Sequence, residues 1–114
     1  MKSAMHPGAR EEFLAAIDYY NDAEPGLGMA FYSEIEDAIA LIERYPDLWI
    51  GIGGGIRRCL VRRFPYAILY SHEAGRIYIY AIMNTSREPD YWSNRLATTI
   101  YLTNAANHSQ ELQG

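Results

Sequence analysis

Residues 76–83 constrain the fold of this chain more than any other segment. They read Arg-Ile-Tyr-Ile-Tyr-Ala-Ile-Met, a nearly continuous run of apolar, strand-forming residues. A strand of this kind is typical of the centre of a sheet that is covered on both faces. We therefore expect the rest of the chain to supply neighbouring strands and a helical layer.

Two more strands are predicted just upstream, over residues 56–63 and 66–70. They meet at Phe64-Pro65-Tyr66, where the proline removes a backbone donor and interrupts strand pairing. Residues 71–75 are expected to form the hairpin loop that leads to the apolar strand. Residues 47–55 are rich in glycine but lack the Lys-Ser/Thr pair and the following helix of a phosphate-binding loop, so they predict a flexible connector.

Apolar residues recur at steps of three and four over residues 8–23 and again over residues 27–45. The intervening Glu24-Pro25-Gly26-Leu27-Gly28 cannot extend a helix cheaply, and Pro46 ends the second pattern. Two helices joined by so short a turn form an antiparallel hairpin, and their apolar faces suit packing on a sheet. Residues 2–6 can form a short strand or remain frayed.

The resulting prediction is an α+β fold, in which an N-terminal helical hairpin packs on a small, mainly antiparallel β-sheet. Asp90 is expected to cap a short C-terminal helix over residues 91–96. At 114 residues the chain suits one domain. We place this domain at residues 1–97 and expect residues 98–114 to form a mobile C-terminal extension.

The net charge of −4 conceals a strong asymmetry along the chain. Residues 1–48 contain ten acids and three bases, whereas residues 49–97 contain seven bases and three acids. This pattern favours an acidic helical layer and a basic working face. No apolar run is long enough for a membrane helix and no signal peptide is evident, so a cytoplasmic protein with no membrane contact is expected.

Few residues offer metal or cofactor chemistry. Cys59 is the only cysteine, which excludes an intrachain disulfide and a thiolate metal cage, and it is expected to be a small buried hydrophobe. The three histidines are scattered and lack metal-ligand spacing. We expect neither a metal nor a cofactor.

Four of the nine arginines, at positions 57, 58, 62 and 63, lie in or beside one predicted strand. Such charges either solvate a sheet edge or face a partner that carries acidic groups or phosphates. The alternation of side chains along a strand does not decide which of these arginines share a face.

Five motifs occur in a recognisable order along residues 6–96. They are Tyr19-Tyr20, Gly26-Leu27-Gly28 with Phe31, Arg57-Arg58, Phe64-Pro65-Tyr66-Ala67-Ile68-Leu69-Tyr70, and Arg87-Glu88-Pro89-Asp90-Tyr91-Trp92. In this order the chain resembles the RelE/ParE superfamily of bacterial type II toxin–antitoxin toxins, of the plasmid stabilisation type. The resemblance implies a small α+β toxin that a cognate antitoxin neutralises, with operator DNA bound only through the antitoxin complex.

The resemblance leaves two activities open, and the residues favour one of them. RelE-like toxins cleave mRNA on the ribosome, whereas ParE-like toxins inhibit DNA gyrase by binding it. Cleavage through the 2′-hydroxyl needs a base and an acid, and ribosome binding favours a basic protein. Here the pI is about 5.3. Where the family commonly shows a histidine and two successive basic residues, this chain has Asn84, which cannot titrate, and Ser86 and Arg87, so that one cation is lost. A gyrase-binding toxin is therefore the first expectation.

The mRNA endonuclease remains the alternative, as does a degenerate toxin that only binds its antitoxin. No catalytic residue is assigned. The residues expected to form the target- or antitoxin-binding face are Arg57, Arg58, Arg62, Arg63, Arg87 and Tyr91.

Overall fold

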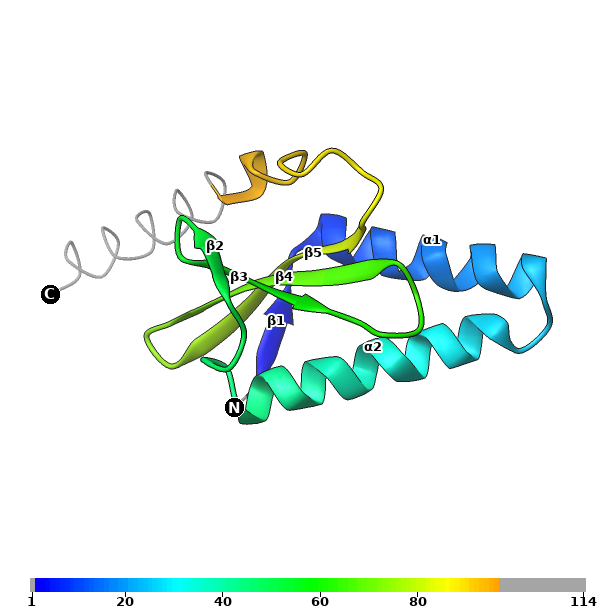
Figure 1. Cartoon of the computed structure of the whole chain (residues 1–114), viewed down its shortest axis with the longest axis horizontal. Coiled ribbons are helices and arrows are strands. Elements are labelled where there is room, and N and C mark those ends of the chain that lie inside the picture. The colour runs from blue at the N-terminus through cyan, green and yellow to red at the C-terminus, as the bar shows by residue number, and fades with distance from the viewer. Residues whose placement is uncertain (1, 97–114) are drawn as a thin grey trace, which may run out of the picture.

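The computed structural model describes residues 2–96, which form a five-stranded sheet and two long helices (Figure 1). The strand order is β1-β5-β4-β3-β2, in which β1 is parallel to β5 and the other neighbours are antiparallel. The elements are β1 (Ser3–Met5), α1 (Pro7–Ala23), α2 (Leu27–Arg44), β2 (Gly51–Gly53), β3 (Ile56–Leu60), β4 (Tyr66–Glu73) and β5 (Arg76–Asn84). The predicted α+β class is confirmed.

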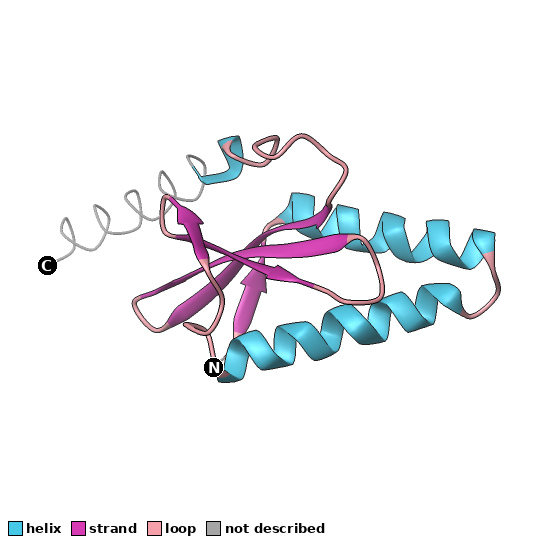
Figure 2. Ribbon diagram, viewed as in Figure 1, coloured by secondary structure: helices cyan, strands magenta, loops and turns pink. Residues whose placement is uncertain are grey.

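Strand β5 is covered on both faces, as its apolar sequence predicts. On one face Ile79 belongs to the core cluster that includes Phe31 of α2. On the other face Ala81 belongs to a second cluster that contains Trp92. Figure 2 shows the resulting layers, with the sheet between the helical hairpin and the C-terminal segment. We refer to residues 85–96 as the C-terminal segment.

Local chemistry sets the helix boundaries. His6 is the N-cap of α1, and its Nδ1 atom accepts a hydrogen bond of 2.9 Å from the backbone N–H of Gly8. Pro7 occupies the first turn, where its missing N–H costs nothing. Gly26 precedes α2 with φ 88°, a left-handed conformation that favours glycine. The helical hairpin follows from these signals.

Gly28 allows the two helices to approach closely. A β-carbon at this position would lie 2.4 Å from the backbone oxygen of Ile17 and 2.5 Å from Cγ of Asn21. The backbone N–H of Gly28 also donates to Oδ1 of Asn21 at 2.9 Å. The second glycine of the Gly-Leu-Gly motif is thus a packing requirement.

We predict that Gly28→Ala lowers the free energy of unfolding by about 2 kcal/mol, because backbone atoms limit the relaxation of α1 away from the added methyl. Urea denaturation followed by circular dichroism measures the effect. Met29→Ala is the control, since Met29 is 56% exposed on the same helix. An unchanged urea midpoint for Gly28→Ala would show that the hairpin can open at no cost.

The predicted flexible connector over residues 47–55 is corrected, because it contains strand β2. Gly51 pairs with Arg57 of β3, and Gly53 pairs with Ile56. The glycines at 53, 54 and 55 have φ values of 106°, 63° and 78°, so they provide the turn that reverses the chain. The glycine run therefore builds a hairpin at the edge of the sheet.

The hairpin predicted over residues 71–75 is also shorter than expected. Strand β4 continues to Glu73, which pairs with Arg76, and only Ala74 and Gly75 form the turn. Both turn residues have positive φ, as a two-residue hairpin turn requires. The polar residues Ser71 and His72 pair within the sheet and do not belong to the loop.

The strand predicted over residues 56–63 ends early, at Leu60. Beyond it the backbone N–H of Arg63 donates to Glu34 of α2 at 2.7 Å, and not to a neighbouring strand. Because the alternation stops, Phe64 turns into the helix-facing core, where its ring lies 5.2 Å from that of Phe31. Strict alternation would place Phe64 on the same face as Arg58. In the structure the two side chains do not share a face.

Both ends of the described chain pack on the sheet. Residues 3–5 form β1, which resolves the choice between a strand and a frayed end. After β5 the chain makes a series of turns, and helical conformation begins only at residue 94. The backbone oxygen of Asp90 accepts hydrogen bonds from the backbone N–H and the hydroxyl of Ser93. The extension expected over 98–114 lies outside the described residues.

Candidate functional site

The six candidate binding residues lie in three places. Arg87 and Tyr91 share a pocket beside α1, and Arg62 and Arg63 border a groove beside α2. Arg57 and Arg58 are adjacent on β3, where successive side chains point to opposite faces. The structure therefore brings the candidates together as pairs and not as one continuous face.

The pocket that contains Arg87 has a volume of about 380 Å³. We call it the Arg87 pocket. It lies where α1, the start of β4, the end of β5 and the C-terminal segment meet. Its lining residues are Glu12, Ala15, Ala16, Tyr19, Tyr66, Ile82, Asn84, Ser86, Arg87 and Tyr91. Three tyrosines and one arginine give it an aromatic and cationic character.

Arg87 is stacked on a tyrosine. Its guanidinium carbon lies 3.9 Å from the centroid of the Tyr91 ring, and the guanidinium of Arg95 lies 5.3 Å from the same centroid. The hydroxyl of Tyr91 donates to Oε2 of Glu12. Burial, and then this hydrogen bond, raise the pKa of Tyr91 well above its usual value. The phenol therefore remains a protonated donor at neutral pH.

Glu12 holds these groups in place. Its Oε1 accepts from the backbone N–H of Ile82 at 3.2 Å, and its two oxygens accept from Arg95 at 3.0 and 3.2 Å. The side chains of Glu12 and Arg95 are each only 16% exposed. Arg95 also donates to the backbone oxygen of Tyr80 at 2.8 Å. One carboxylate thus ties α1 to β5 and to the C-terminal segment.

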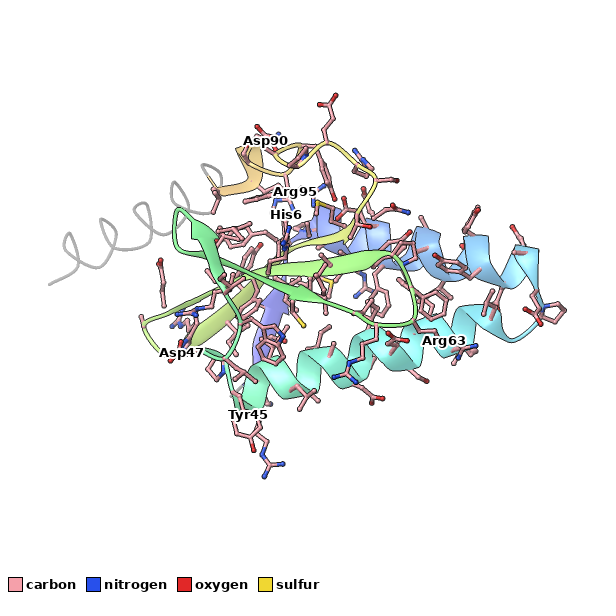
Figure 3. The ribbon with its side chains drawn as sticks, in the orientation of Figure 1. His6, Tyr45, Asp47, Arg63, Asp90 and Arg95 are labelled. Carbon is pink, nitrogen blue, oxygen red and sulfur yellow. The ribbon has the colours of Figure 1, made fainter. Side chains whose placement is uncertain are left out.

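Arg95 reaches back across the start of α1. Figure 3 shows it close to His6, between the sheet and the C-terminal segment. A β-carbon on Gly8 would lie 2.7 Å from the guanidinium carbon of Arg95. Burial, and then the charge of Arg95, lower the pKa of His6, which suits the neutral ring that caps α1.

Asn84 and Ser86 shape the mouth of the Arg87 pocket. Oδ1 of Asn84 accepts from the backbone N–H of Ser86 at 2.9 Å and from its hydroxyl at 2.7 Å. These two bonds form a local turn that positions the residue after Ser86. Arg87 is that residue, and its backbone N–H donates to the backbone oxygen of Asn84 at 3.0 Å.

The second surface is a groove of about 510 Å³ between α2 and β3. We call it the α2–β3 groove. Leu41 and Leu60, which are 49% and 55% exposed, supply apolar surface, and Cys59 lies beneath them. Arg62 and Arg63 border it on one side. Figure 3 shows Arg63 beside α2.

Arg57 holds the β2 hairpin to the sheet. Its guanidinium donates to the backbone oxygens of Asp47 and Trp49 at 3.2 and 2.7 Å. His72 bonds to the Asp47 carboxylate at 2.8 Å, and the Tyr70 hydroxyl donates to Pro46 at 2.6 Å. The hydrogen bond between His72 and Asp47 is the main reason that the pKa of Asp47 is lowered. The geometry gives Arg57 a structural role, whereas Arg58 is exposed.

Sequence reasoning missed the role of Glu12. Glu12 is not among the residues singled out from the sequence, although helical spacing carried a signal. Glu12 follows Ala9 by three residues and precedes Ala16 by four, and both alanines are buried. An acid in that row faces the protein, where it needs a cationic partner.

Two other features are absent from the part of the chain that the structure describes. Within residues 2–96 no three His, Cys, Asp or Glu side chains are grouped so that they could hold a metal ion. None of the helices in that range has the length and apolarity needed to span a membrane.

Comparisons with known proteins support the fold. Neither the protein-family models nor the curated proteins contain a match to this sequence. Among solved structures, the chain is similar to one described as "Chromosomal ParDE TA system from P. aeruginosa". The TM-score is 0.66 at 17% identity, and the match covers 74% of this chain and 95% of that chain. The chain thus has a ParE-like α+β fold.

Proposed function

We propose that this chain is the toxin of a type II toxin–antitoxin system, that it stops growth by binding DNA gyrase, and that a cognate antitoxin neutralises it. The ParE-like fold supports the toxin assignment. Arg87 and Tyr91 in the Arg87 pocket, with Arg58, Arg62 and Arg63, are the proposed contacts with target or antitoxin. Operator DNA is contacted only through the antitoxin complex.

The chemistry of the Arg87 pocket carries the choice of binding over catalysis. Glu12 is the one carboxylate among the residues that line the pocket, and both of its oxygens already accept hydrogen bonds. Asn84 cannot exchange a proton, and arginine stays protonated near neutrality. A group that removes a proton from a ribose hydroxyl must be free to reach it. The pocket suits recognition better than RNA cleavage.

Induction of the chain without an antitoxin tests the proposal. We expect growth to stop, an SOS reporter to rise and DNA breaks to accumulate, while ribosome-associated mRNA stays intact. Purified gyrase should lose supercoiling activity when the chain is added. Co-expression of the protein encoded beside this gene should restore growth if that protein is the antitoxin.

Two other outcomes would replace this proposal. Cleaved mRNA without DNA damage would identify a ribosome-dependent endonuclease. Normal growth in the presence of folded protein would identify a degenerate toxin that only binds an antitoxin.

A further inference from the structure

The Arg87 pocket carries one uncompensated positive charge. The charge of Glu12 is balanced by Arg95 at 3.0 Å. Among residues 2–96, no carboxylate forms an ion pair with Arg87. The pocket therefore presents a net cation to whatever enters it.

The other polar groups of the Arg87 pocket are suited to donate hydrogen bonds. Because Oδ1 of Asn84 is engaged by Ser86, its Nδ2 amino group is the part that can meet a ligand. Tyr19 and Tyr66 add hydroxyl groups, and the Tyr19 side chain is 67% exposed. The acceptor oxygens of Glu12 are already saturated. A ligand that fits these groups is an anion with acceptor oxygens.

Stacking prepares Arg87 for a planar anion. The Tyr91 ring covers one face of the guanidinium at 3.9 Å, which leaves the N–H groups at its edges available. A carboxylate accepts two parallel hydrogen bonds from such an edge. A volume of about 380 Å³ admits a side chain or a short loop but not a folded element.

The wall formed by α1 limits how much negative charge can bind. Glu11, Asp18 and Asp22 are exposed and follow the helical spacing of Ala15, which lines the pocket. These acids repel a nucleic acid strand, because a strand carries a row of phosphates and not a single negative group. A single carboxylate held at Arg87 avoids most of this repulsion.

We propose that the Arg87 pocket is a binding site for one carboxylate of a peptide, namely an aspartate or glutamate side chain of the protein partner. Arg87 binds the carboxylate through both oxygens, the Asn84 amide adds a donor, and Glu12 sets the position of the Tyr91 ring that supports Arg87. The identity of the partner rests on the proposed function, whereas the chemistry of the pocket does not.

The test is a nuclear magnetic resonance titration of the isotope-labelled full chain with N-acetylglutamate N-methylamide. We expect saturable shifts of the Arg87 Nε–H and Asn84 side-chain amide signals, with a dissociation constant on the order of 1 mM. The glutamine analogue should bind at least roughly tenfold more weakly, because it lacks the charge.

Matched variants locate the site. Arg87→Gln should weaken glutamate binding by roughly tenfold or more, and Arg87→Lys should give an intermediate loss because it keeps the charge without the fork of donors. Arg76→Gln is the control, since Arg76 is exposed at the start of β5 and does not line the pocket. The backbone amide spectrum of each variant verifies that it is folded.

Several results would overturn the inference. They are equal shifts from the glutamate and glutamine compounds, no saturable shift, and tighter binding of a single-stranded RNA hexamer, which would indicate a phosphate site. Growth inhibition is scored separately. A chain that binds glutamate but does not inhibit growth would contradict the proposed function and leave the pocket chemistry in place.

Discussion

Glu12→Ala is expected to lower the free energy of unfolding by about 3 kcal/mol, because it removes the carboxylate that balances the charge of Arg95 in a site where both side chains are 16% exposed. The Tyr91 hydroxyl and the backbone N–H of Ile82 lose an acceptor at the same time. Denaturant unfolding followed by circular dichroism measures the loss.

Glu11→Ala is a matched control for this variant. Glu11 is the same residue type on the same helix, but it is exposed. Its replacement should change stability by less than about 0.5 kcal/mol, as surface substitutions usually do. Equal denaturation midpoints for the two variants would mean that the Glu12–Arg95 pair does not hold the C-terminal segment.

Trp92→Ala is expected to cost about 3 kcal/mol or more, since the indole is 6% exposed and fills the second core cluster. The indole N–H also donates to the backbone oxygen of Pro89 at 2.7 Å, which fixes the turn before it. Leu48→Ala is the control, because Leu48 is 70% exposed.

The losses of stability caused by Glu12→Ala and Trp92→Ala should be non-additive. Glu12 and Trp92 hold the same C-terminal segment to the sheet, one through ion pairing and one through packing. Once either is removed, the other has less structure left to stabilise. A double variant that costs the full sum of the single losses would show that the two contacts act on separate parts of the fold.

The sequence predicted the architecture well because periodicity is a local signal. Helical spacing identified α1 and α2, and the apolar run over 76–83 identified the central strand. The sequence-based prediction failed for β2. There the glycines were interpreted as a flexible connector, whereas their positive φ values build the tight turn that follows the strand. It also extended β3 too far, because the bond from Arg63 to Glu34 is a tertiary contact with no local signature.

The candidate site was less accessible to sequence reasoning. Arg87 and Tyr91 were singled out, and the structure does bring them together in one pocket. The sequence did not decide which of the four arginines at 57, 58, 62 and 63 share a face. In the structure Arg57 bonds to the β2 hairpin, while Arg62 and Arg63 border a different groove. Glu12 and Arg95 were not paired, since 83 positions separate them.

The parallel pairing of β1 with β5 affects the order in which the chain can fold. Ser3 pairs with Ile77, so the first strand must wait for the last strand before it finds its neighbour. The helical hairpin relies on contacts between nearby residues and can form early, whereas closing the sheet requires a loop of more than half the chain. During synthesis, β1 therefore stays unpaired until residues 76–84, which form β5, have left the ribosome.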